Sequence, residues 1–247
     1  SLEVYKIASQ SGTKSSLEAA TELASKLGVV SSAKEEDGEW VFLNEAGEML
    51  RVSKADLSFY FKPVLSGDQF SILPKEKLQE KIVSFLGAAG LYKSILDSAE
   101  IEVKALRDTG YVLVPEPRSE EADFYEFDFK LKQGDYPIVS QGSSEIAVVS
   151  ATIDKFGELF LMEYSLGEVQ YDIFGVYPVK DLTSLMQDLH NGKGVIVGAR
   201  EPGFDSYFVS GTIESISFTK VELAYFQDIT SGFLEPIWIL EGVAVVD

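Results

Sequence analysis

Short segments that alternate between apolar and polar residues run through most of this chain, and they outnumber its helical patterns. From Phe124 to Leu131, apolar side chains occupy every second position and charged side chains stand between them. The stretch from Ser217 to Phe226 alternates in a similar way. Because successive side chains of a strand point to opposite faces, both stretches are predicted to be strands. The charged positions from Phe124 to Leu131 also predict one wet face for that strand.

Three helical patterns interrupt these strands, and they begin near Ser15, Pro74 and Pro178. Each pattern has an apolar stripe at helical spacing and ends near a glycine, which is a common helix stop. Strand hairpins follow each helix. The sequence therefore predicts an α+β fold of mostly antiparallel sheets, each covered by a helix, in repeated helix-plus-hairpin units. Single helices do not alternate with single strands, which argues against Rossmann and TIM-barrel folds.

A break in the pattern near Pro63 and Ser66-Gly-Asp68 suggests a domain boundary. We expect a small N-terminal α+β unit over residues 1–68. A larger C-terminal α+β domain would span residues 69–247.

The charge and the absent residue types exclude several function classes. Forty acidic residues against twenty-one lysines and arginines give a formal net charge of −19, which repels nucleic acid and anionic lipid headgroups. With no cysteine and one histidine, His190, the chain cannot build thiolate or multi-histidine metal sites. His190 falls in the last turn of a predicted helix, where a surface or capping role is expected. No cofactor, nucleotide or metal motif is present, so a non-catalytic protein is expected.

The same features suggest where the protein works. A chain without cysteine suits an exported protein that needs no disulfides. No apolar run reaches the roughly 18 residues needed to cross a bilayer. The opening Ser1-Leu2-Glu3 lacks an initiator Met, and we expect that an upstream signal or anchor has been removed.

The C-terminal part carries a recognisable pattern. A helix introduced by Tyr177-Pro178, a strand that ends in Leu223-Ala-Tyr225, and a last strand with Leu234-Glu-Pro-Ile-Trp238 follow one another over roughly residues 177–242. This pattern resembles the closing segment of YycH/YycI-type extracytoplasmic regulatory proteins and related bacterial lipoproteins. The helix-plus-hairpin units upstream are similar in layout to PepSY-like modules.

The resemblance implies a non-enzymatic regulatory or interaction domain outside the cytoplasmic membrane. Such a protein would be membrane-anchored through an N-terminal helix or a lipid. Its partner would be another envelope or membrane protein, in the best-known relatives a sensor histidine kinase. A purely structural envelope lipoprotein is a related alternative that differs only in having no switchable partner.

Aromatic residues in the strands are the candidate interaction residues. In an alternating strand the second set of aromatic side chains must be covered or exposed, and an exposed set rimmed by acids would suit protein docking. Trp238, beside Pro236, is expected to be mainly a packing residue at a sheet edge or bulge. The candidates are Tyr60, Phe124, Tyr177, Tyr225 and Trp238.

A carbohydrate-active hydrolase is the alternative from another class. Glu120, Glu121, Asp123, Glu126 and Asp128 could supply a pair of carboxylates for glycoside hydrolysis. Acids on the wet face of a strand are, however, usually only solvated. A deep cleft with paired acids would favour the enzyme, whereas a flat sheet with an exposed apolar patch would favour the binding protein.

Overall fold

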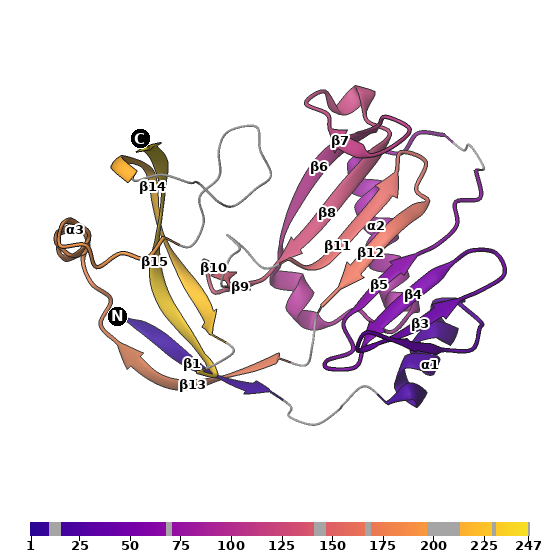
Figure 1. The fold of residues 1–247 in the computed structure, drawn as a ribbon, viewed down its shortest axis with the longest axis horizontal. Helices are drawn as coiled ribbons and strands as arrows, with labels where there is room; N and C mark the ends of the chain where they lie inside the picture. Colours follow the sequence, from indigo (N-terminus) through magenta and orange to yellow (C-terminus); the bar gives the residue numbers. More distant parts are fainter. Residues whose placement is uncertain are drawn as a thin grey trace. The chain divides into compact units, whose positions relative to one another are not determined.

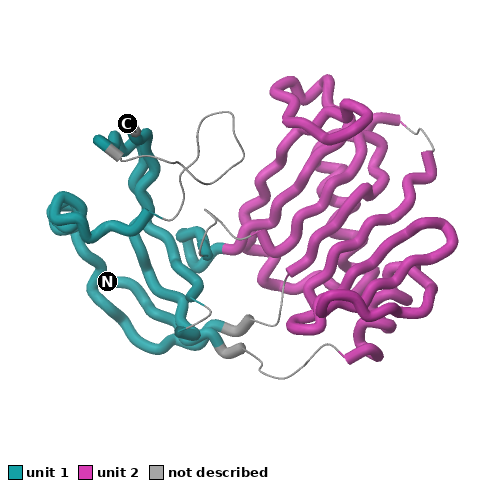
Figure 2. The backbone as a smooth tube through the Cα atoms, viewed as in Figure 1, with its two compact units in different colours: residues 1–9, 132–146, 169–247 teal, residues 10–131, 147–168 magenta. Residues whose placement is uncertain are grey.

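The computed structural model describes residues 1–9, 16–67, 71–140, 147–165, 169–196, 213–228 and 231–246. The chain forms two compact units that interleave in sequence (Figure 2). Unit 1 comprises residues 1–9, 132–146 and 169–247, and unit 2 comprises residues 10–131 and 147–168. The boundary predicted between residues 68 and 69 lies outside the described residues, within the chain range of unit 2.

Unit 2 is built on a nine-stranded sheet in which every pair of neighbours is antiparallel (Figure 1). The strand order is β2-β3-β4-β5-β12-β11-β8-β6-β7. The strands are β2 (Lys34–Glu36), β3 (Glu39–Leu43), β4 (Met49–Ser53), β5 (Phe59–Lys62), β6 (Glu100–Asp108), β7 (Leu113–Pro115), β8 (Phe124–Lys130), β11 (Ala147–Asp154) and β12 (Leu159–Tyr164). Helices α1 (Leu17–Lys26) and α2 (Lys75–Ala88) belong to the same unit.

The core of unit 2 lies on the face of the sheet where α2 packs. The helix buries Leu78, Ile82 and Leu86, and its Phe85 ring stacks on Phe61 of β5 at 6.0 Å between centroids. On β8, Phe127 is fully buried. The alternation that predicted β8 therefore places its aromatic set in the core.

Unit 1 is a six-stranded sheet of order β13-β1-β15-β14-β10-β9. Its strands are β1 (Leu2–Ser9), β9 (Lys132–Gln133), β10 (Tyr136–Val139), β13 (Val169–Tyr177), β14 (Ile213–Asp228) and β15 (Phe233–Val246). All neighbouring pairs are antiparallel except β10 and β14, which are parallel. Helix α3 (Leu182–His190) is the remaining α-helix, and none of its residues is buried.

The predicted fold class is wrong. Of the described residues, 48% lie in strands and 20% in helices, so the protein is predominantly β with two large sheets. Of the three α-helices in the described residues, two belong to unit 2, and no residue of α3 is fully buried, so the sheets are not each covered by a helix. The error arose because consecutive helix-plus-hairpin segments looked like repeats, whereas β1 pairs with β13 and β15 from the far end of the chain.

Candidate functional site

Four of the five carboxylates proposed for hydrolysis are held in ion pairs, and the fifth, Glu120, is exposed. Lys104 Nζ lies 3.0 Å from Glu126 Oε1 and 2.6 Å from Asp128 Oδ2, and Asp128 is only 6% exposed. Burial disfavours the charged amine, but hydrogen bonds to Asp128 and Glu126 outweigh it and raise the pKa of Lys104 above its ordinary value. These two acids of β8 therefore have a structural role, because they form ion pairs with Lys104 on the neighbouring strand β6.

The acids just before β8 are engaged in the same way. Glu121 Oε2 lies 2.6 Å from Arg118 Nη2, and Asp123 Oδ1 lies 3.0 Å from Lys155 Nζ. Neither the shallow hollow beside Ser16 and Leu17 nor the one beside Tyr5 and Tyr225 is lined by any of these carboxylates. Among the described residues, no group of three or more His, Asp or Glu is placed to hold a metal ion.

Two of the predicted aromatic residues lie in unit 2. Phe124 on β8 is 9% exposed and packs against Phe160 at 5.1 Å between ring centroids. Tyr60 on β5 is half-buried, and it pairs with Arg51 of β4 and Glu163 of β12. Their positions suit packing within the sheet.

The other three predicted aromatic residues lie in unit 1 and differ in exposure. Tyr177 is 46% exposed at the end of β13, where its ring lies over Gly175. Trp238 on β15 is half-buried, and its Nε1 donates to the Lys180 carbonyl at 3.0 Å. Tyr225 on β14 is only 2% exposed. The hairpin register brings Tyr225 and Trp238 to one face, whereas Tyr177 lies on a different strand.

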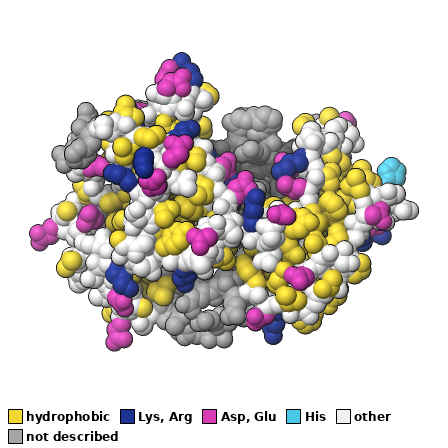
Figure 3. Space-filling view, turned by 180° about the vertical axis from the view of Figure 1, so that it is seen from behind, with side chains coloured by type: hydrophobic (Ala, Val, Ile, Leu, Met, Phe, Trp, Pro, Cys, Tyr) yellow, Lys and Arg dark blue, Asp and Glu magenta, His cyan; other side chains and the backbone are white. Residues whose placement is uncertain are grey.

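Unit 1 exposes many large apolar side chains, and we call this set the unit 1 apolar surface. Thirteen of the twenty exposed large hydrophobic residues found in the described part of the chain belong to this unit. Figure 3 shows hydrophobic side chains gathered on the part of the molecule that carries the histidine. The surface comprises Ile173, Phe174, Val176, Tyr177, Leu182, Met186, Val195, Ile196, Ile216, Phe218, Val221, Val243 and Val245.

The far end of the β14–β15 hairpin contributes the most unusual part of this surface. β10 pairs with β14 only at Tyr225 and Phe226, and β1 pairs with β15 only near Leu234. In the described part of unit 1, the ladder beyond Trp238 therefore has no third strand. Both faces of this two-stranded ribbon expose apolar groups, with Phe218 on one face and Val243 on the other. Two-stranded ribbons alone are marginally stable in water, so this end of the hairpin depends on the rest of unit 1 for its stability.

A second feature of unit 1 arises at Pro236. The antiparallel pairs Tyr5–Leu234 and Lys6–Phe233 would place Glu3 opposite Pro236 if the ladder continued. Proline has no N–H to donate, and the ladder ends there. Tyr225, the direct partner of Pro236 on the other side, instead donates its hydroxyl to the Glu3 carbonyl at 2.9 Å. The proline thus lies in an inner strand, at the point where β1 and β15 part.

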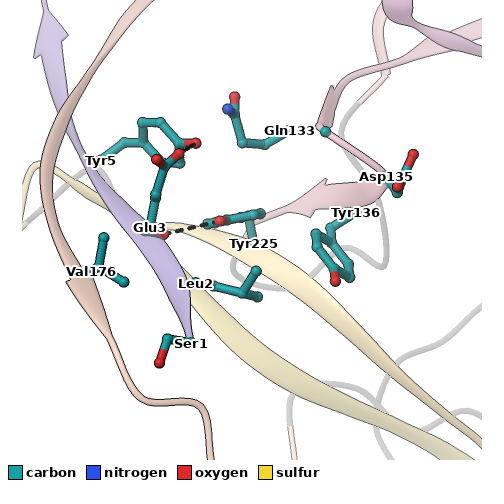
Figure 4. A pocket seen from close by; sticks show the side chains of 10 residues that line it. Ser1, Leu2, Glu3, Tyr5, Gln133, Asp135, Tyr136, Val176 and Tyr225 are labelled. Atoms are coloured by element: carbon teal, nitrogen blue, oxygen red, sulfur yellow. Dashed lines mark hydrogen bonds between the residues drawn. The ribbon is translucent and has the colours of Figure 1, made fainter.

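Residues of β1, β13, β14 and the β9–β10 segment line a hollow that we call the tyrosine pocket (Figure 4). Its volume is about 470 Å³, and all of its residues belong to unit 1. The Tyr225 ring meets the rings of Tyr5 and Tyr136 edge to face, at 5.7 and 6.1 Å between centroids. Burial, together with the nearby Tyr5 and Glu3, raises the pKa of Tyr225 to about 12. The lining residues are Ser1, Leu2, Glu3, Tyr5, Gln133, Gly134, Asp135, Tyr136, Val176 and Tyr225.

Among the residues that line this pocket, Tyr225 alone is predicted from the sequence to be an interaction residue. Alternation in β1 places Glu3 and Tyr5 on one face, which is a usable signal. The neighbours of that face come from residues 133–136 and 225, far away in sequence, and no local pattern indicates such pairing.

Comparisons with known proteins found no match: no protein family, no curated protein and no solved structure resembles this chain. No family evidence therefore supports the YycH/YycI-like label. The expectation of PepSY-like modules is wrong, because the chain is predominantly β. Within the described residues, none of the helices has the length and apolar character needed to span a membrane.

Proposed function

We propose that this protein is a non-catalytic interaction or regulatory domain that works outside the cytoplasmic membrane and binds another protein through unit 1. The unit 1 apolar surface is the observation that carries the proposal. Large exposed apolar patches are uncommon on monomeric soluble proteins and mark interaction sites. The absence of cysteine suits an oxidising compartment.

The ribbon at the end of the β14–β15 hairpin supports a mode of binding. Its exposed apolar side chains, among them Phe218, Val221 and Val243, are available on both faces. The backbone edges beyond Trp238 also offer hydrogen-bonding groups to an incoming strand. A partner that adds a strand to this ribbon and covers Phe218 would bury apolar area and, at the same time, pair with the backbone groups at the edge of the ribbon. We expect this partner to be an envelope or membrane protein, such as a sensor.

The hydrolase alternative receives less support. Glu121, Asp123, Glu126 and Asp128 make ion pairs with lysine or arginine. None of the proposed carboxylates, Glu120 included, lines either hollow. A general acid in a glycosidase needs a raised pKa, whereas bonds from Lys155 and from the Asp108 amide outweigh burial and lower the pKa of Asp123.

Site-specific photo-crosslinking in cells tests the proposal. A photoreactive phenylalanine at Val243, which is 65% exposed in unit 1, is compared with one at Val30, which is 80% exposed in unit 2. We expect Val243 to crosslink to one membrane protein, identified by mass spectrometry, and Val30 to give no such product. The product should disappear when Phe218→Ser removes apolar area from the opposite face.

Three results would overturn the proposal. Equal crosslinking from Val30 and Val243 would show that unit 1 has no preference. A product made only of two copies of this chain would replace an external partner with self-association. No product from Val243 or from a second probe at Val221 would leave the apolar surface without a partner.

A further inference from the structure

We propose that the tyrosine pocket binds an organic cation on an apolar stem, the chemistry presented by the side chain of lysine or arginine. The inference deepens the proposed function and rests on it for the source of the cation, since a basic side chain of the partner would supply the group. A free alkylamine has the same chemistry and is the other source to be tested.

The aromatic floor of the pocket provides the first part of the argument. Tyr225 and Tyr5 are 2% and 8% exposed, so their rings are fixed by packing, and Tyr136 stands half-buried beside them. The edge-to-face contacts hold the three rings in one cluster. The face of a tyrosine ring attracts a cation, and the attraction grows when water is excluded. A methylene stem would pack on the same rings.

The charges around the pocket provide the second part. Glu3 is half-buried, Asp135 is exposed, and the Gln133 amide lies between them along the rim in Figure 4. Among the described residues, no lysine or arginine side chain lines the pocket. Its lining carries two carboxylates and one cation, the α-amino group of Ser1, so the site keeps an excess of negative charge. The acids around β8 in unit 2 are instead paired with lysine and arginine side chains.

The Tyr5 hydroxyl holds the Glu3 carboxylate in place through a hydrogen bond. It donates to Glu3 Oε2, which orients the carboxylate on the rim. Burial and the hydrogen bond to Glu3 raise the pKa of Tyr5, so the phenol remains a neutral donor. An anionic ligand would meet two carboxylates in a chain of net charge −19, and the same field attracts a cation. Cations are therefore favoured over anions.

Titration of the isotope-labelled full chain, followed by NMR of the tyrosine rings, tests the inference without any partner protein. The ligands are Nα-acetyl-lysine methylamide, Nα-acetyl-arginine methylamide and the uncharged Nα-acetyl-norleucine methylamide. We expect both cations to shift the Tyr5, Tyr136 and Tyr225 signals at millimolar concentration. Norleucine, with a similar stem and no charge, should bind at least tenfold more weakly. Equal binding of norleucine would overturn the inference.

A matched pair of double variants locates the effect. Glu3→Gln with Asp135→Asn removes both pocket charges and keeps an oxygen that can accept the Tyr5 hydrogen bond. Glu45→Gln with Glu120→Gln removes two charges from exposed sites in unit 2. We expect about a tenfold loss of lysine-amide affinity in the first variant and less than a twofold loss in the second. Equal losses would reduce the effect to overall charge and overturn the site.

Two further ligands separate the sources of the cation. Tighter binding of an Ala-Lys-Ala peptide than of butylammonium would support a protein side chain, and equal affinity would support a free amine. The same double variants, carried into the crosslinking experiment, separate the two proposals. Crosslinking that persists at Val243, with no cation binding to the wild-type chain, would leave the proposed function standing and remove this inference.

Discussion

Both units are built on mostly antiparallel sheets, but they bury very different numbers of apolar side chains. Unit 2 holds twenty-eight of the thirty-five buried hydrophobic residues in the described part of the chain, and unit 1 holds seven. Exposed large hydrophobic residues show the opposite distribution, with seven in unit 2 and thirteen in unit 1. Both units contain strands with alternating side chains, so alternation by itself does not explain this contrast in burial.

The helices account for much of the difference. Helix α2 presents Leu78, Ile82 and Leu86 to its sheet and buries them, whereas Leu182 and Met186 of α3 are 52% and 45% exposed. Burial of apolar area is the main favourable term in folding. Unit 2 therefore has a helix that buries apolar side chains against its sheet, whereas unit 1 leaves more of its large apolar side chains exposed.

The largest expected effect comes from matched phenylalanine truncations in the two units. Phe127→Ala removes a fully buried ring from β8 and should lower the free energy of unfolding of unit 2 by about 3–5 kcal/mol. Phe218→Ala removes a ring that is 38% exposed and should cost unit 1 less than about 1 kcal/mol.

Urea unfolding followed by tryptophan fluorescence measures both effects, because each unit has one tryptophan. Trp40 reports on unit 2 in a Trp238→Phe background, and Trp238 reports on unit 1 in a Trp40→Phe background. Similar costs for the two truncations would contradict the proposed contrast between the units.

A second prediction concerns the backbone of the unit 1 ribbon. A Cβ at Gly242 would lie 2.4 Å from the Ser217 carbonyl oxygen and 3.0 Å from Phe218 Cα, next to the β-bulge between Phe218 and Lys220. Gly242→Ala must therefore move the backbone, and we expect a loss of about 1–3 kcal/mol in unit 1, read by Trp238.

The matched control for this change lies in unit 2. A Cβ at Gly87 in α2 meets no atom within 4 Å, and alanine is the better helix former. Gly87→Ala should stabilise unit 2 by up to about 1 kcal/mol. Destabilisation by both changes would show that glycine flexibility, and not the close approach in the ribbon, explains the Gly242 result.

Local features of the fold could be predicted from the sequence, but the assembly could not. The apolar stripe after Pro74 predicted α2 and its buried face, and alternation predicted β8. Periodicity of this kind reports which side chains share a face. It does not report what covers that face, and for this reason α3 was expected to cover a sheet while the structure leaves it exposed.

The environment of the candidate site residues also could not be predicted from local patterns. Tyr225 was predicted to be an interaction residue because it lies in an alternating aromatic strand, and Phe124 was predicted for the same reason. The structure places Tyr225 in the tyrosine pocket and Phe124 against Phe160. Pairs such as β1 with β13 join residues at least 160 positions apart, so no local pattern distinguishes the two environments.

A smaller effect tests how unit 1 tolerates Pro236. Tyr225→Phe removes the hydroxyl that donates to the Glu3 carbonyl, and we expect a cost of about 1 kcal/mol. Pro236→Ala restores an N–H opposite Glu3 that can donate in its place. In a double-mutant cycle, the Tyr225 substitution should therefore cost less in the Pro236→Ala background than in the native chain. Strict additivity would mean that the tyrosine does not replace the missing donor.

The smallest expected effect compares one tyrosine from each unit. Tyr164 in unit 2 donates its hydroxyl to the Leu91 carbonyl at 2.9 Å, whereas the buried hydroxyl of Tyr171 in unit 1 has no partner among the described residues. Tyr164→Phe should cost about 1 kcal/mol, and Tyr171→Phe should be neutral or slightly stabilising, because it removes an unsatisfied polar group. The urea midpoints of the two units measure the difference.

Alkaline titration sharpens this last comparison. Burial raises the pKa of both Tyr164 and Tyr171 to about 12, above the value near 10 of an unfolded chain. Each phenol is therefore protonated more readily in the folded state, and the stability it contributes is present below pH 10 and is lost as pH rises from about 10 to 12. Replacing Tyr171 by phenylalanine should remove part of the alkaline loss of unit 1 without changing its stability at neutral pH. Replacing Tyr164 should lower the stability of unit 2 by about 1 kcal/mol at neutral pH, and this deficit should shrink as pH rises from about 10 to 12, because the variant has no phenol to ionise. Destabilisation of unit 1 by Tyr171→Phe at neutral pH would instead mean that the Tyr171 hydroxyl has a hydrogen-bond partner in solution. The buried polar groups of unit 1 would then be as well paired as those of unit 2.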